Sequence, residues 1–322
     1  MGKETEMLIV SSIFPNQQLQ MELQKEFPGV TFEFYEGMKG AEKSFYEAEV
    51  LITYGEDLTE KHIEQHKGLK WIMLMTAGFD KLPLEAVKEK GVMVTNVRGI
   101  HKIPMAEFAM GTMLQHVKQT KILMENENQL VWNRNVRLEE LCDKTILILG
   151  VGSIGREIAR LAKAFRMKTM GVNRSGRAVE HIDELYHINQ MLQALPKADF
   201  IVSILPSTPE TKHLLKKEHF IQMKQSAVLI NIGRGDIVDE SILIEVMNQR
   251  EIAHAYLDVF EQEPLEPNHP FWLMDNVTIS PHLSSLSERY LPRSFTIFKH
   301  NLNMYLNKKN KYINLVDLQK GY

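Results

Sequence analysis

Short apolar runs alternate with amphipathic stretches along the first hundred residues. Segments such as 16–27 and 58–67 carry apolar positions at helical spacing. Between them, runs rich in Val, Ile, Leu and Met predict five strands, over 7–14, 30–36, 50–55, 69–75 and 92–97. Strands that alternate with helices are typical of a parallel sheet whose faces are covered by helices. The pattern therefore predicts an α/β unit at the start of the chain.

A long apolar segment then interrupts the alternation. Residues 102–124 predict one long helix, and Pro104 fits its first turn, where a missing N–H does no harm. A second alternating series begins at Thr145 and predicts six strands, over 145–150, 168–173, 198–205, 226–233, 254–260 and 276–281. A last helix is predicted over 285–309, with Pro292 kinking or delaying it. The chain therefore predicts two α/β units.

The first strand of the second series ends in glycines, in the sequence TILILGVGSIG (145–155). In a dinucleotide-binding loop, Gly150 would permit the tight turn, Gly152 would let a pyrophosphate approach the backbone, and Gly155 would let the helix pack closely on the strand. The helix N-terminus would present free N–H groups to the phosphates. This strand–turn–helix context favours a dinucleotide site over a purely structural turn. The predicted contacts are Gly150, Gly152, Ser153, Ile154 and Gly155.

The next strand predicts which dinucleotide binds. It ends in GVNRSGR, with Asn173 where an NAD site usually has an acidic residue for the ribose 2′-OH. Asparagine has no charge to repel a 2′-phosphate, and Arg174 and Arg177 would attract one. NADP(H) is therefore the preferred cofactor and NAD a possible one, with contacts at Asn173, Arg174, Ser175 and Arg177. The alternative is that these arginines are solvated loop residues.

Three side chains suited to acid–base and anion chemistry follow later strands. They are Arg234 in NIGRGDIVDE, Glu263 in LDVFEQEPL and His282 in TISPHLSS. Each stands beside glycine or proline turn residues, after a strand, where an open α/β sheet binds its ligands. These positions predict a site formed by Arg234, Glu263 and His282.

The chain resembles the D-isomer-specific 2-hydroxyacid dehydrogenase family. The matching blocks cover about residues 70–285 and run in order: TAGFDKLP, AEFAMGTML, GVGSIGREIA, ILPSTPETKHLL, LINIGRGDIVDE, AYLDVFEQEPL and TISPHLS. The resemblance implies that Arg234 binds the substrate carboxylate and polarises its carbonyl, that His282 is the acid/base, and that Glu263 pairs with it. It also implies a second carboxylate anchor at the backbone N–H groups near Ala77 and Gly78. Further cofactor contacts implied are Ile204, Leu205, Pro206, Ile232 and, facing the nicotinamide amide, Asp258.

The resemblance also implies an inserted domain. A Rossmann dinucleotide-binding domain, residues 100–283, would interrupt a flavodoxin-like substrate-binding domain made of residues 1–99 and 284–322. Both domains would be α/β with parallel sheets. The family's habit suggests a homodimer built on the dinucleotide domains. Trp132 and Trp272 are expected in core or domain-interface packing rather than in the substrate pocket.

These residue types suit the reduction of a 2-oxo acid. Histidine can donate a proton and take it back near neutral pH, a neighbouring carboxylate favours imidazolium, and arginine binds a carboxylate in a fork. The leading hypothesis is NAD(P)H-dependent reduction of a small 2-oxo acid of the glyoxylate or hydroxypyruvate type to the D-2-hydroxy acid. One alternative is an NAD-dependent dehydrogenase of D-lactate or another D-2-hydroxy acid. A second, from another class, is a dinucleotide-sensing binding protein.

Composition narrows the remaining functions. A formal net charge of −3 over 322 residues gives no electrostatic footprint for nucleic acid. No apolar stretch reaches the roughly 20 residues of a membrane span, and the N-terminus has no secretory pattern. With Cys142 as its one cysteine, the chain predicts a cytoplasmic protein. The histidines do not fall at ligand spacings, so no metal site is expected.

Overall fold

The computed structural model describes residues 7–79 and 81–318. The chain divides into two compact units, one made of Met1–Ile100 and Ser287–Tyr322 and the other of His101–Leu286. The second unit is thus inserted into the sequence of the first. The resemblance implied boundaries at 99/100 and 283/284, whereas the two units divide at 100/101 and 286/287.

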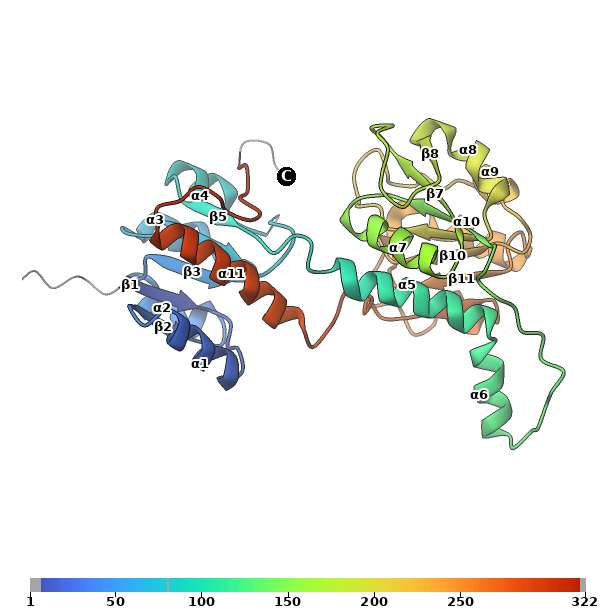
Figure 1. Cartoon of the computed structure of the whole chain (residues 1–322), viewed down its shortest axis with the longest axis horizontal. Coiled ribbons are helices and arrows are strands. Elements are labelled where there is room, and N and C mark those ends of the chain that lie inside the picture. Colours follow the sequence, from blue (N-terminus) through green and yellow to red (C-terminus); the bar gives the residue numbers. More distant parts are fainter. Residues whose placement is uncertain (1–6, 80, 319–322) are drawn as a thin grey trace, which may run out of the picture. The chain divides into compact units, whose positions relative to one another are not determined.

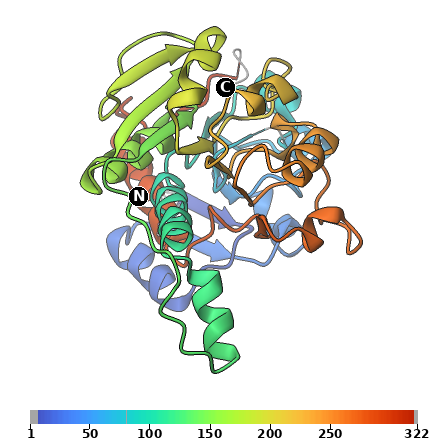
Figure 2. The same ribbon diagram turned by 90° about the vertical axis from the view of Figure 1, so that its right-hand side faces the viewer.

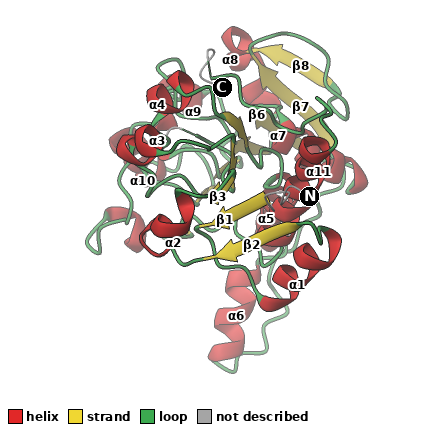
Figure 3. Cartoon of the chain, turned by 90° about the vertical axis from the view of Figure 1, so that its left-hand side faces the viewer, coloured by secondary structure: helices red, strands yellow, loops and turns green. Residues whose placement is uncertain are grey.

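The first unit contains a five-stranded parallel sheet in the order β2-β1-β3-β4-β5 (Figures 1 and 3). The strands are β1 (Met7–Ser11), β2 (Val30–Phe34), β3 (Val50–Thr53), β4 (Trp71–Leu74) and β5 (Met93–Thr95). Apolar residues of α1 (Gln17–Glu26) and α11 (Tyr290–Leu306) pack on one face, and those of α2 (Met38–Phe45), α3 (Glu60–Gln65) and α4 (Leu84–Glu89) on the other. All five predicted strands are confirmed, in the strand order of flavodoxin-like folds.

Helix α11 completes this core although it follows the inserted unit in sequence. The fully buried Trp71 of β4 stacks on Phe298 of α11, with ring centroids 5.5 Å apart. Its indole N–H donates to the hydroxyl of Thr95 on β5 at 2.9 Å. An antiparallel bridge between Thr95 and Leu315 brings the following segment to the same edge. Because these contacts bury large apolar side chains, residues from both ends of the chain are needed to form one core.

The second unit contains a seven-stranded parallel sheet in the order β12-β11-β10-β9-β6-β7-β8. The strands are β6 (Thr145–Leu149), β7 (Lys168–Asn173), β8 (Glu184–His187), β9 (Phe200–Ser203), β10 (Val228–Asn231), β11 (His254–Leu257) and β12 (Val277–Ile279). Helices α5 (Lys102–Val117) and α7 (Ser153–Ala164) pack on one face. The other face is covered by α8 (Met191–Ala194), α9 (Lys217–Ile221) and α10 (Glu240–Asn248). The predicted α/β fold with two parallel sheets is therefore confirmed.

Three local predictions were wrong. The second sheet has a seventh strand, β8, whose side chains are only partly buried, so its sequence lacks the continuous apolar run of the central strands. The predicted helix over 102–124 is two helices, because Gln119 adopts a left-handed φ of 51° between α5 and α6 (Thr120–Asn128). Helix α11 begins at Tyr290 rather than 285, with Pro292 in its first turn. No helix among the described residues is long and apolar enough to cross a membrane.

Candidate active site

The loop between β6 and α7 is shaped by its glycines. Gly150 has φ +101°, a region that favours glycine, and a Cβ added to Gly155 would lie 2.5 Å from the carbonyl oxygen of Gly150. By contrast, a Cβ added to Gly152 would meet nothing within 4 Å. The backbone conformation therefore explains the glycine at position 150, and close packing explains the glycine at position 155. The open space at Gly152 lies at the N-terminus of α7 and fits the close approach of a dinucleotide phosphate.

Replacement by alanine should have different effects at Gly155 and at Gly152. Gly155→Ala forces the strand and helix apart and is expected to cost about 1–3 kcal/mol of unfolding free energy. Gly152→Ala enters open space, so it should cost less than about 1 kcal/mol, the scale of a poorer N-cap, and should instead weaken cofactor binding. Thermal melts and fluorescence titration with NADPH measure the two effects. Undiminished NADPH affinity in Gly152→Ala would contradict a phosphate site here.

The turn after β7 uses the side chain of Asn173 for its own structure. The side-chain oxygen Oδ1 of Asn173 accepts the N–H of Gly176 at 2.7 Å. The side-chain nitrogen Nδ2 of Asn173 donates to the backbone carbonyl of Arg177 at 3.3 Å. The hydroxyl of Ser175 accepts the Arg177 N–H at 3.3 Å. These bonds close a turn that leaves Arg174 and Arg177 exposed. The acidic residue typical of NAD sites is thus replaced by a neutral residue that holds two arginines in one turn.

A cavity of about 460 Å³ lies next to this turn, within the second unit. Arg174 lines it, together with His187 of β8 and Glu210 of the segment after β9. His187 of the edge strand β8 pairs with Asn173 of β7, so the unpredicted strand β8 supplies one wall. The pKa of Glu210 is lowered by a hydrogen bond with Thr208 and by the charge of Arg174. The cavity therefore offers a guanidinium and a carboxylate to a polar ligand.

His282 and Glu263 form a direct pair. His282 Nδ1 lies 2.7 Å from Glu263 Oε2, and Glu263 Oε1 accepts the N–H of Phe260 at 3.0 Å. The His282 and Glu263 side chains are 45% and 35% exposed, so both can meet a ligand. If the carboxylate accepts the Nδ1 hydrogen, Nε2 is left for substrate. The resemblance implied this pair, and its part in catalysis stays a prediction.

The loop that carries His282 is held by Asp258. The Asp258 carboxylate is buried and accepts hydrogen bonds from the Ser280 hydroxyl at 2.6 Å and from the backbone N–H groups of Leu283 and Ser284 at 2.9 Å each. The N–H of His282 donates to the Asp258 carbonyl at 2.9 Å, and His282 itself has a left-handed φ of 55°. Sequence reasoning missed this structural role of Asp258. Its predicted place against the nicotinamide amide stays a prediction.

Arg234 lies between two glycines that allow a tight backbone passage. A Cβ on Gly233 would be 2.7 Å from the carbonyl oxygen of Leu205, and one on Gly235 would be 1.9 Å from the carbonyl carbon of Phe260. Arg234 itself is exposed, and its guanidinium donates to the Gly233 carbonyl at 2.8 Å. The G-R-G sequence therefore lets the segment after β10 touch the segments after β9 and β11 while presenting a cation.

The three predicted chemical groups follow neighbouring strands. Arg234 comes after β10, Glu263 after β11 and His282 after β12, and these strands are adjacent and parallel. Carboxyl ends of parallel strands share one edge of a sheet, which is where ligands of such sheets bind. The topology thus gathers the three residues at one edge, and the structure shows direct contact for Glu263 and His282.

The other predicted contacts differ in exposure. Pro206 is exposed, Ile204 and Leu205 are partly buried, and Ile232 is only 2% exposed in the core. In the first unit, Ala77 and Gly78 follow β4, and their carbonyl oxygens accept hydrogen bonds from Asn96 and Thr76, each at 2.7 Å. Among the described residues, no group of three or more His, Cys, Asp or Glu could hold a metal ion.

Comparison with known proteins gives consistent matches. The profile described as "D-isomer specific 2-hydroxyacid dehydrogenase, NAD binding domain" matches residues 110–284. The chain is 35% identical over 269 residues to a glyoxylate reductase of Aeropyrum pernix, covering 80% of this chain and 79% of that enzyme. A D-isomer-specific 2-hydroxyacid dehydrogenase family protein of Aeromonas salmonicida superposes with a TM-score of 0.85 at 32% identity, over 98% of this chain and 100% of that one. An NADPH-dependent glyoxylate/hydroxypyruvate reductase of Sinorhizobium meliloti, solved with NADP and sulfate, gives 0.79 at 25% identity, over 98% and 100%.

Proposed function

Because the chain belongs to the D-isomer-specific 2-hydroxyacid dehydrogenase family, we propose that it reduces a small 2-oxo acid to the D-2-hydroxy acid with NADPH as the preferred reductant. Membership makes the chain an NAD(P)-dependent oxidoreductase. The finer proposal is a substrate of the glyoxylate or hydroxypyruvate type, as the names of similar proteins suggest. The observation that carries it is the contact of 2.7 Å between His282 and Glu263, one strand away from Arg234.

Each side chain has a defined task in this reaction. Bound nicotinamide supplies the hydride for the carbonyl carbon. His282 gives the carbonyl oxygen its proton from Nε2, while Glu263 contacts Nδ1 and holds the ring in place. Arg234 binds the substrate carboxylate and offsets the negative charge that develops on the carbonyl oxygen. The N–H groups of Ala77 and Gly78 are the proposed second anchor of the carboxylate.

The residues proposed to hold the cofactor lie in the second unit. The glycine loop at 150–155 would bind the pyrophosphate, and its open space at Gly152 supports this. Arg174 would bind the 2′-phosphate at the cavity it lines, which the Glu210 carboxylate also lines. Asn173, next to Arg174 in sequence, adds no negative charge there. A panel of glyoxylate, hydroxypyruvate and branched 2-oxo acids, assayed with NADPH and with NADH, tests the proposal. No turnover with any short 2-oxo acid would overturn it.

Removing Arg174 should lower the preference for NADPH. A charge-assisted hydrogen bond contributes about 1.5–3 kcal/mol, so Arg174→Ala is expected to lower kcat/KM for NADPH by about 10- to 100-fold and to change that for NADH little. Arg177→Ala is the matched control, because it removes an equal charge from the same turn, and we expect a smaller effect. Equal losses with both cofactors in Arg174→Ala would refute the phosphate contact and favour NAD dependence.

We further propose a homodimer built on the second unit. Helix α6 stands away from the sheet in Figures 1 and 2, and after it Leu130 and Trp132 are 94% and 91% exposed. Trp132 is therefore not a core residue, contrary to one of the two expected placements. Clustered exposed apolar side chains are typical of a protein–protein contact. Sedimentation velocity at micromolar concentration should find a dimer that Trp132→Ala weakens, whereas a monomeric wild type would refute this arrangement.

A further inference from the structure

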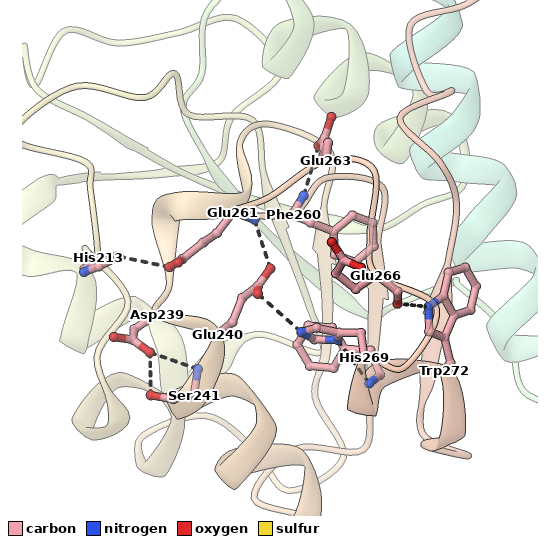
Figure 4. A network of polar contacts seen from close by, with 11 residues as sticks. His213, Asp239, Glu240, Ser241, Phe260, Glu261, Glu263, Glu266, His269 and Trp272 are labelled. Atoms are coloured by element: carbon pink, nitrogen blue, oxygen red, sulfur yellow. Dashed lines mark hydrogen bonds and ion pairs between the residues drawn. The ribbon is translucent and has the colours of Figure 1, made fainter.

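The loop that carries Glu263 is attached at both ends to one carboxylate, that of Glu240 (Figure 4). Glu240 is the first residue of α10, directly after the segment that bears Arg234. Its Oε1 accepts the backbone N–H of Glu261 at 2.9 Å. Its Oε2 lies 3.4 Å from Nε2 of His269, at the far end of the loop. One side chain therefore bridges two points eight positions apart in sequence.

The geometry of His269 assigns its hydrogen to the side that faces Glu240. His269 Nδ1 accepts the N–H of Phe271 at 3.3 Å and so caps the short helix Pro270–Leu273. In the neutral ring the hydrogen then sits on Nε2, which points at the Glu240 carboxylate. The imidazole also packs on the ring of Phe271, with centroids 4.6 Å apart. The side chains of Glu240 and His269 are only 20% and 16% exposed, so solvent competes little for this pair.

A second histidine–carboxylate contact on the same loop is more exposed. His213 Nε2 lies 3.0 Å from Glu261 Oε1, and the two side chains are 42% and 35% exposed. Exposed pairs of this kind contribute little, because water and salt screen them. The contacts of Glu240 are the better shielded restraint on the loop backbone.

The contacts of Glu240 are connected to the acid–base pair formed by Glu263 and His282. Glu261 follows Phe260, whose N–H donates to Glu263 Oε1, and Glu263 Oε2 meets His282 Nδ1. We propose that Glu240, oriented by His269, is a positioning residue that keeps the Glu263 carboxylate in contact with His282. This inference rests on the proposed function, because it assigns the pair to 2-oxo acid reduction. Glu240 also links the Glu263 loop to Arg234, because Glu240 and Arg234 both lie in the stretch 234–240.

The variants Glu240→Ala and Glu240→Gln distinguish a positioning role of Glu240 in catalysis from a purely structural role. Glu240→Ala should lower kcat for hydroxypyruvate reduction by about tenfold or more, since small misplacements of reacting groups are costly. KM and the Kd for NADPH should change less than about threefold, because neither ligand touches Glu240 in this account. Glu240→Gln keeps an oxygen for the Glu261 N–H and should retain most of the activity. The matched control is Glu245→Ala, which removes the same charge from the same helix but contacts Lys217 instead.

The split between kcat and KM gives a readout that a merely structural role would not move. In Glu240→Ala the kcat should fall while KM and the Kd for NADPH stay near the wild-type values, whereas in Glu245→Ala none of the three should change. The proposal is overturned if the two variants have equal kcat. It is also overturned if Glu240→Gln is as impaired as Glu240→Ala and KM and Kd change as much as kcat.

His269→Asn provides an independent test if Glu240→Ala does not fold. Asparagine can still cap the helix at Phe271, since its side-chain oxygen accepts an N–H, but it cannot reach Glu240 as an imidazole does. We expect a lower kcat, with KM and the Kd for NADPH changed less than about threefold. Wild-type kinetics in His269→Asn would overturn the proposal. A wild-type enzyme inactive on every 2-oxo acid would instead refute the proposed function, which the activity panel detects separately.

Discussion

Replacing His282 with asparagine is expected to lower kcat for 2-oxo acid reduction by about 10²- to 10⁴-fold, the range for loss of a positioned general acid. Asparagine suits the left-handed φ of 55° at this position, so the loop should keep its conformation. It cannot transfer a proton to the substrate. Steady-state rates at saturating NADPH, with circular dichroism to check folding, measure the effect.

The same variant separates an enzyme from a dinucleotide-sensing protein. His282 is not among the residues proposed to hold the cofactor, so NADPH affinity should change less than about threefold. His300→Ala is the control, because this exposed histidine makes one hydrogen bond, to the Lys311 carbonyl, in the first unit. An unchanged rate in His282→Asn would remove the imidazole from the mechanism.

Replacing Arg234 with alanine is expected to lower kcat/KM by about 10²- to 10³-fold. The loss combines weaker binding of the substrate carboxylate with less stabilisation of the carbonyl oxygen, so KM should rise and kcat should fall. Arg234→Lys keeps the charge but not the fork of donors, and it should lie between wild type and alanine. These constants are measured by varying the 2-oxo acid at saturating NADPH.

Arg250→Ala is the matched control for the guanidinium. Arg250 pairs with Asp275 at 2.9 Å on the surface of the same unit, and both side chains are more than half exposed. We expect wild-type kinetics from it. If Arg234→Ala keeps its kcat/KM within about twofold of this control, Arg234 does not bind the substrate.

Most of the fold could be predicted because central strands of parallel sheets are continuous apolar runs. Val50–Thr53 and Val228–Asn231 are fully buried along their length, and their sequences are easy to recognise. Strand β8 is an edge strand with partly exposed residues, so its sequence has no such run. The break between α5 and α6 occurs at Gln119, where there is no glycine or proline, so the local sequence did not predict it.

Candidate residues of the site could be proposed from the sequence, but the side chains that support them could not. Glycine and proline turns after strands marked Arg234, Glu263 and His282. The contact between Glu240 and Glu261 joins residues 21 positions apart, and an acidic residue in the first turn of a helix is ordinary. The buried carboxylate of Asp258 likewise acts through a loop that folds back on it. Such contacts depend on tertiary folding rather than on local pattern.

The product of the reaction tests the central claim most directly. The claim is that Arg234, Glu263 and His282 together reduce a 2-oxo acid to one enantiomer. Wild-type enzyme supplied with hydroxypyruvate and NADPH should form the D-hydroxy acid in a one-to-one ratio with NADPH consumed, as read by chiral chromatography and absorbance. His282→Asn should form almost none. Formation of the L-enantiomer, or equal product from wild type and His282→Asn, would contradict the account.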